Sequence, residues 1–151
     1  MVHLARRFFG FLTARPLGPV DQAFVSESIN PQLQALFYMQ RYEDQRHALD
    51  VAARVAHDPE LIEAALLHDI GKTTVHLGAI KRSVATMWAA TSLPIWGEWL
   101  SYRDHGPIGA ELLEAHGAGA LAISFTRHHP GKPPASCNQA HWIALEQADH
   151  G

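Results

Sequence analysis

The sequence predicts an all-α protein in which several helices pack into one domain. Apolar residues recur at three- and four-residue spacing through most of the 151-residue chain, which is the period of an amphipathic helix and not of a strand. Hydrophobic residues make up 47% of the chain and charged residues 18%, a composition typical of a compact globular domain. Because the sequence contains no internal repeat and no linker, we expect a single domain over residues 19–151, preceded by an N-terminal arm over residues 1–18.

The individual helices are predicted from their start and stop signals. Pro31 is typical of a first helical residue, and the apolar stripe that follows predicts a long or kinked helix over much of residues 31–56. Asp58 followed by Pro59 indicates the cap and first residue of a second helix, which Gly71 is expected to end or bend. Further helices are predicted over residues 81–90, 108–115, 118–128 and 138–150, with a proline-rich loop over residues 129–137.

Charge and cysteine content exclude several classes of function. A formal net charge of −3 gives no reason to expect a protein that coats nucleic acid, because such binding needs a strongly basic surface. The single cysteine, Cys137, excludes an intrachain disulfide and fits a reducing, cytoplasmic location. No segment approaches the roughly 20 apolar residues that cross a bilayer, so we expect no transmembrane segment and an arm that packs on the body of the domain.

The pair His68-Asp69 indicates a metal site, because it lies in a helix that is otherwise apolar. An ionised Asp that faces a core costs several kcal/mol unless it is paired or binds a cation. Imidazole nitrogen together with carboxylate oxygen suits Mn²⁺, Fe²⁺, Zn²⁺ or Co²⁺ better than Ca²⁺. On the preceding helix, Glu43 and His47 are four residues apart and share one face. Further candidate ligands near predicted helix ends are His105, His128, His129 and Asp149.

These residues resemble the motif of a known family, the HD superfamily of metal-dependent phosphohydrolases. The resemblance lies in His47, in the pentad His68-Asp69-Ile70-Gly71-Lys72 and in Asp149, and it covers about residues 43 to 149. It implies a multi-helix bundle in which His47, His68, Asp69 and Asp149 hold a metal ion between the helices.

The resemblance is nearest to the binuclear, HD-GYP-like subset of this superfamily. It implies a second metal ion held by His105, His128 and His129, with Asp69 bridging the two ions. It also implies that Glu43 and Lys72 lie at the site. Where that subset carries its Gly-Tyr-Pro signature, this chain reads Pro-Gly-Lys-Pro over residues 130–133.

The expected function is hydrolysis of a small phosphorylated compound such as a nucleotide, by a phosphomonoesterase or phosphodiesterase reaction that uses a metal-activated water. Two divalent ions can clamp phosphoryl oxygens and lower the pKa of a water molecule, and Lys72 supplies a positive donor to the phosphate. The expected catalytic residues are Asp69, Lys72 and Glu43. Two alternatives stay open: a di-iron oxygenase with the HD fold, and a metal-binding regulatory module without catalysis.

Overall fold

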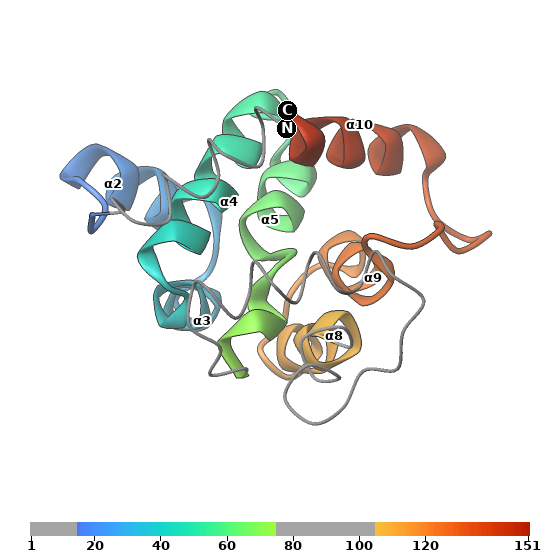
Figure 1. The fold of residues 1–151 in the computed structure, drawn as a ribbon, viewed down its shortest axis with the longest axis horizontal. Helices are drawn as coiled ribbons and strands as arrows, with labels where there is room; N and C mark the ends of the chain where they lie inside the picture. The colour runs from blue at the N-terminus through green and yellow to red at the C-terminus, as the bar shows by residue number, and fades with distance from the viewer. Residues whose placement is uncertain (1–14, 75–104) are drawn as a thin grey trace, which may run out of the picture.

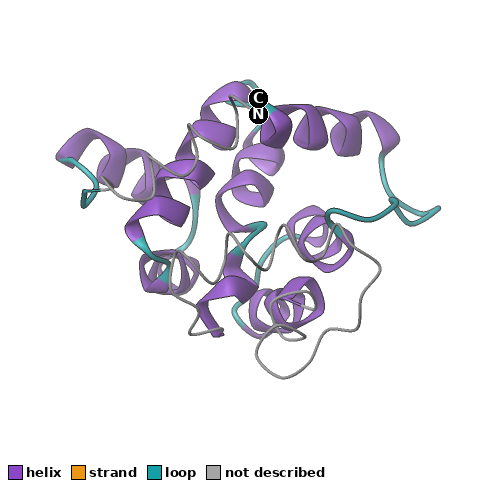
Figure 2. Cartoon of the chain, in the orientation of Figure 1, coloured by secondary structure: helices purple, strands orange, loops and turns teal. Residues whose placement is uncertain are grey.

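The computed structural model describes residues 15–74 and 105–151, and within these ranges all regular structure is helical (Figures 1 and 2). The predicted all-α fold is therefore confirmed. The first 14 residues of the predicted arm and the helix predicted over residues 81–90 lie outside the described residues. The elements are α2 (Pro19–Ser28), α3 (Pro31–Met39), α4 (Tyr42–Arg54), α5 (Pro59–Leu67), the short 3₁₀ helix η1 (Ile70–Thr74), α8 (His105–Ala115), α9 (Ala120–His128) and α10 (Gln139–His150).

Three helices begin at side-chain caps that could be predicted from the sequence. The Asn30 side chain accepts hydrogen bonds from two backbone amides of the first turn of α3, and Asn138 does the same for α10. Asp58 accepts from the amide of Glu60 and caps α5. Each cap satisfies amides at a helix start that have no partner within the helix.

The helix predicted over residues 31–56 is divided into α3 and α4. Gln40 and Arg41 both adopt extended backbone, with ψ angles of 153° and 154°. The break is stabilised by side-chain amides: Gln45 Nε2 donates to the Gln40 carbonyl at 2.8 Å, and Gln40 Nε2 donates to the Leu66 carbonyl at 3.5 Å. These two side-chain hydrogen bonds, one to α5 and one within the turn, thus take the place of the backbone hydrogen bonds that a continuous helix would have.

The core surrounds α5, which lies between α4, α9 and α10 (Figure 1). The C-terminal residues of α5, from Ala64 to Leu67, are fully buried. Around them pack the largest fully buried side chains, which come from several helices: Leu33, Phe37, Leu113, Phe125, Trp142 and Leu145. This buried half of α5 ends directly before His68-Asp69.

Glycine allows η1 and α8 to approach closely just beyond this point. A Cβ atom added at Gly71 would overlap the carbonyl oxygen of His105 and lie 2.9 Å from the amide nitrogen of Gly109. Any larger residue at position 71 would therefore push α8 away from η1. None of the helices in the described part of the chain is long and apolar enough to cross a membrane.

Candidate metal centre

Four helix ends and one helix face bring six of the seven predicted ligands together in space. His47 projects from the middle of α4, while His68 and Asp69 follow the end of α5. His105 begins α8, His129 follows α9, and Asp149 lies in the last turn of α10. The sequence separates these residues by as many as 102 positions, so packing of the helices brings them together.

Three imidazoles surround the carboxylate of Asp149. His47 Nε2 lies 2.7 Å from Oδ1, His68 Nε2 lies 3.6 Å from the same oxygen, and His129 Nε2 lies 3.2 Å from Oδ2. The Asp149 side chain is only 11% exposed. A buried carboxylate in this position is stabilised by positive charge, either as protons on the imidazoles or as a cation bound between them.

His68 is held in the orientation and tautomer that a metal ligand needs. Its Nδ1 donates to the carbonyl of Ala65 at 2.8 Å, which leaves the Nε2 lone pair of the neutral ring free to coordinate. The ring is 1% exposed, and Nε2 faces the carboxylates of both Asp69 and Asp149, at 3.5 and 3.6 Å.

Two further side chains hold the end of α5, just before His68. Gln40 Nε2 donates to the carbonyl of Leu66 at 3.5 Å, and Thr126 Oγ1 donates to the carbonyl of Leu67 at 3.4 Å. These carbonyls lie where the α-helix gives way to η1, and buried carbonyls there need donors from elsewhere. Neither Gln40 nor Thr126 could be identified from the sequence, because nothing in it shows which carbonyl a distant side chain will reach.

Asp69 is the second buried carboxylate of the cluster, with a side chain 5% exposed. It forms an ion pair with Lys72, one turn further along in η1. Its other oxygen, Oδ1, lies 3.5 Å from His105 Nε2. Asp69 Oδ2 therefore faces both Lys72 and His68, while Oδ1 faces His105.

Both carboxylates stay ionised in spite of their burial. Burial alone would raise the pKa of Asp69, but Lys72, His68 and His105 hold that pKa well below its ordinary value. Burial likewise opposes ionisation of Asp149, while hydrogen bonds from His129, His47 and His68 hold its pKa far below the ordinary range. Burial would lower the pKa of His68, yet Asp69 and Asp149 raise it overall. The cluster is therefore an anionic centre that favours added positive charge.

The donor set fits a divalent transition metal. One ligand atom each from His47, His68 and Asp149 lies within 4.8 Å of the other two, so a single ion can contact all three with small side-chain movements. Two imidazole nitrogens and a carboxylate oxygen are donors that Zn²⁺, Mn²⁺, Fe²⁺ and Co²⁺ accept. The His68 Nδ1 hydrogen bond to a backbone carbonyl is the outer contact that orients such a ligand.

The remaining predicted residues, Glu43, His129 and His128, differ in their burial and in their contacts with this group. Glu43 is one turn before His47, and its Oε1 lies 2.5 Å from Arg41 Nε, with only 9% of the side chain exposed. His129 stacks on Phe125, with ring centroids 4.8 Å apart, so that its Nε2 faces Asp149. His128 is exposed. Among the described residues, no side-chain hydrogen bond or ion pair connects His128 to the cluster.

We therefore expect the two neighbouring histidines to differ in their effect on metal binding. His129→Ala is expected to weaken binding of Mn²⁺ or Co²⁺ by about tenfold or more, because it removes a buried imidazole beside Asp149. His128→Ala is expected to have a smaller effect. Isothermal titration of the two variants with the same metal checks this, and a larger loss with His128→Ala would show that the ring of His128 turns inward when metal binds.

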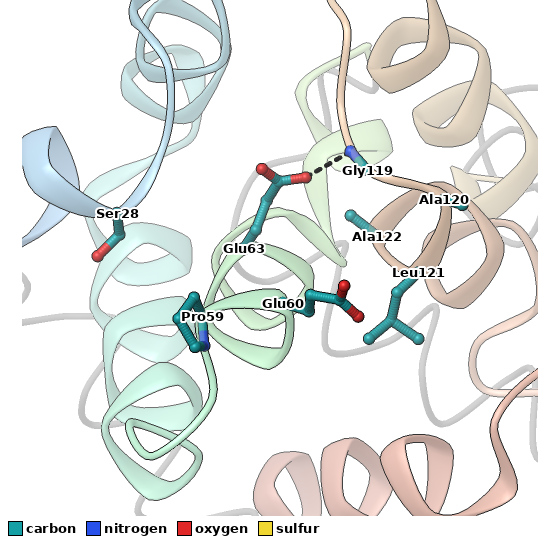
Figure 3. A pocket seen from close by; sticks show the side chains of 8 residues that line it. All are labelled: Ser28, Pro59, Glu60, Glu63, Gly119, Ala120, Leu121 and Ala122. Atoms are coloured by element: carbon teal, nitrogen blue, oxygen red, sulfur yellow. Dashed lines mark hydrogen bonds between the residues drawn. The ribbon is translucent and has the colours of Figure 1, made fainter.

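One surface pocket lies away from the cluster, where the N-terminal ends of α5 and α9 meet (Figure 3). It encloses about 330 Å³. Glu63 on its wall accepts a hydrogen bond at 2.6 Å from the amide of Gly119, the residue directly before α9. None of the predicted ligands or catalytic residues lines this pocket, so it is not part of the candidate metal centre.

Comparison with known proteins identifies the family of the chain. The family model described as the HD domain matches residues 41–149, which span α4 to the last turn of α10 and contain every predicted ligand. No curated protein and no solved structure matches the chain. HD domains are generally metal-dependent hydrolases, and the match covers well over half of the sequence. The chain therefore belongs to the HD-domain family.

Proposed function

We propose that the protein hydrolyses a small phosphorylated compound such as a nucleotide, by a phosphomonoesterase or phosphodiesterase reaction. The observation that carries this proposal is the buried group of His47, His68 and Asp149 beside a second ionised carboxylate, Asp69. A divalent metal bound there would polarise phosphoryl oxygens and supply an activated water. Membership of the HD family supports the same reaction class.

In this proposal the histidines and carboxylates of the cluster bind the metal ion, and Lys72 binds the anionic substrate. His68 and Asp149 are fixed by their hydrogen bonds and would hold the metal, together with His47 and Asp69. Lys72 is 17% exposed and pairs with Asp69, so its ammonium group is kept at the edge of the cluster. There it can donate to a phosphoryl oxygen as a charge-assisted hydrogen bond.

A second metal ion, held by His105, His128 and His129 with Asp69 as bridge, remains part of the proposal. The 3.5 Å distance between His105 Nε2 and Asp69 Oδ1 supports a donor pair on that side of Asp69. Glu43, in the first turn of α4, is proposed to orient the attacking water. The low exposure of its side chain supports this role. Likeness to the HD-GYP-like subset stays a prediction.

The domain boundary and the cellular location are also proposals. We infer one domain over residues 19–151, because α2 begins at Pro19 and packs against α3 and α5. The last part of the predicted arm lies on this domain: Leu17 is buried, and Arg46 donates to the carbonyls of Arg15 and Pro16. We place the protein in the cytoplasm, because its one cysteine is a free thiol.

Metal removal tests the proposed function. Chelator-treated protein is expected to release no p-nitrophenol from p-nitrophenyl phosphate or bis(p-nitrophenyl) phosphate, and Mn²⁺, Fe²⁺, Zn²⁺ or Co²⁺ is expected to restore release, because the cluster supplies no activated water without an ion. Absorbance at the nitrophenolate band follows the reaction. The relative rates on the two esters separate monoesterase from diesterase activity.

A parallel preparation of Asp69→Ala controls for a contaminating phosphatase, because the activity of a contaminant would not follow the substitution. Protein that binds metal but hydrolyses neither these esters nor nucleoside mono-, di- and triphosphates would contradict the proposal and favour the regulatory module. Consumption of O₂ by the Fe²⁺ form without phosphate release would favour the di-iron oxygenase.

A further inference from the structure

The last turn of α10, which carries Asp149, has a donor for each of three successive carbonyls. His150 Nδ1 donates to the carbonyl of Glu146 at 2.7 Å, and the Gly151 amide donates to that of Gln147 at 3.2 Å. The carbonyl of Ala148, directly before Asp149, receives Arg54 Nη1 at 2.7 Å. The first two donors belong to α10 and its end, whereas Arg54 comes from α4, 94 positions away. Of these three backbone donors, only Arg54 comes from another helix.

Arg54 and His47 lie on one face of α4, because seven residues correspond to nearly two helical turns. This face contacts the last turn of α10 at two points: His47 Nε2 lies 2.7 Å from the carboxylate of Asp149, and Arg54 lies 2.7 Å from the adjacent backbone. Figure 1 shows the C-terminal end of α10 (red) beside the end of α4. One contact reaches the side chain of Asp149, and the other reaches the carbonyl of the preceding residue, Ala148.

The chemistry of the Arg54 contact suits a positioning role. A cation at the C-terminal end of a helix interacts favourably with the partial negative charge of the last carbonyls. A guanidinium–carbonyl hydrogen bond is also stronger than a neutral one. Helix ends fray easily. If the turn that carries a ligand were frayed, metal binding would be weaker, because part of the binding free energy would be used to order that turn.

We propose that Arg54 is a positioning residue that fixes the last turn of α10 so that Asp149 faces His47, His68 and His129 before metal binds. This inference rests on the proposed metal site. Arg54 itself touches neither the ligand atoms of the cluster nor substrate in this proposal. It acts on metal affinity through the Ala148 backbone.

Cobalt titration of the full chain tests the proposal, because the visible absorption of bound Co²⁺ reports both affinity and ligand geometry. Arg54→Ala is expected to raise the Kd for Co²⁺ by about tenfold, the lower end of the effect of losing an outer contact to a metal site. Arg54→Lys is expected to recover most of the affinity, because an ammonium group can donate to the same carbonyl. In metal-free protein, Arg54→Ala is also expected to speed amide exchange in the peptide that contains residues 146–150.

Arg46→Ala is the matched control. Arg46 lies on the same helix and also donates to backbone carbonyls, but those belong to Arg15 and Pro16, which precede α2, and not to α10. We expect its Kd for Co²⁺ to equal that of the unchanged protein. A normal Kd in Arg54→Ala, or an equal loss in Arg46→Ala, would overturn the positioning role while leaving the metal site intact. Absence of Co²⁺ binding by the unchanged protein would overturn the proposed function, and the Arg54 inference with it.

Discussion

Replacing Asp149 with Asn is expected to weaken binding of a divalent metal by about hundredfold or more and to abolish hydrolysis. The substitution keeps the size of the side chain but removes the negative charge on which His47, His68 and His129 converge. Loss of an outer partner of a metal site typically costs about 10–100-fold in affinity, and loss of an anionic ligand should cost at least as much. Isothermal titration with Mn²⁺ and elemental analysis of the purified variant measure the effect.

Asp58→Asn is the matched control for this substitution. Asp58 also faces an imidazole, with Oδ2 3.5 Å from His141 Nε2, but it lies at the start of α5, away from the cluster. Asn caps helices about as well as Asp, so the fold should be unaffected. Unchanged affinity in Asp149→Asn would show that this residue is not a ligand, whereas equal losses in both variants would indicate a general effect of net charge.

Gly71→Ala is expected to destabilise the protein by about 3 kcal/mol and to weaken metal binding at the same time. The added methyl group has to overlap the His105 carbonyl, and overpacking of this kind typically costs about 1–3 kcal/mol. Relief requires α8 to move away from η1, which separates His105 from Asp69. Urea unfolding followed by circular dichroism gives the change in the free energy of unfolding, and Co²⁺ absorption gives the change at the site.

Gly18→Ala separates this effect from the general consequences of losing a glycine. Gly18 has a φ of −74°, which any residue can adopt, and a Cβ added there meets nothing within 4 Å. Its free energy of unfolding should stay within about 1 kcal/mol of the unchanged protein. Equal stability of Gly71→Ala and Gly18→Ala would show that η1 and α8 are not closely packed in solution.

Most helices of the described chain could be predicted because their signals are local. Proline and a capping Asn or Asp are neighbours in sequence of the helices that they start, so α3, α5 and α10 begin within a residue of their expected positions. The break at Gln40 and Arg41 had no such local signal. It depends on a hydrogen bond to Leu66 of another helix, and an apolar stripe that continues on both sides gives no sign of it.

The residues of the candidate site could be predicted only in part, because their final positions depend on how the helices pack. The resemblance to the HD superfamily pointed to His47, His68, Asp69 and Asp149, and the structure brings all four into one buried cluster, although their roles as ligands stay predictions. Spacing gave equal weight to His128 and His129. Successive residues at a helix end point in different directions, and it is His129 whose ring packs against Phe125 and His68 and faces Asp149.

By itself the sequence determined that the chain is helical, where most of its helices start, and that it carries the motif of the HD family, because periodicity, caps and motifs are properties of neighbouring residues. Only the tertiary structure decided which of the histidines in the described residues face Asp149, that Lys72 pairs with Asp69, and that Arg54 reaches the last turn of α10. These contacts join residues on different helices or at the junctions between them, and they follow from how buried surfaces fit together.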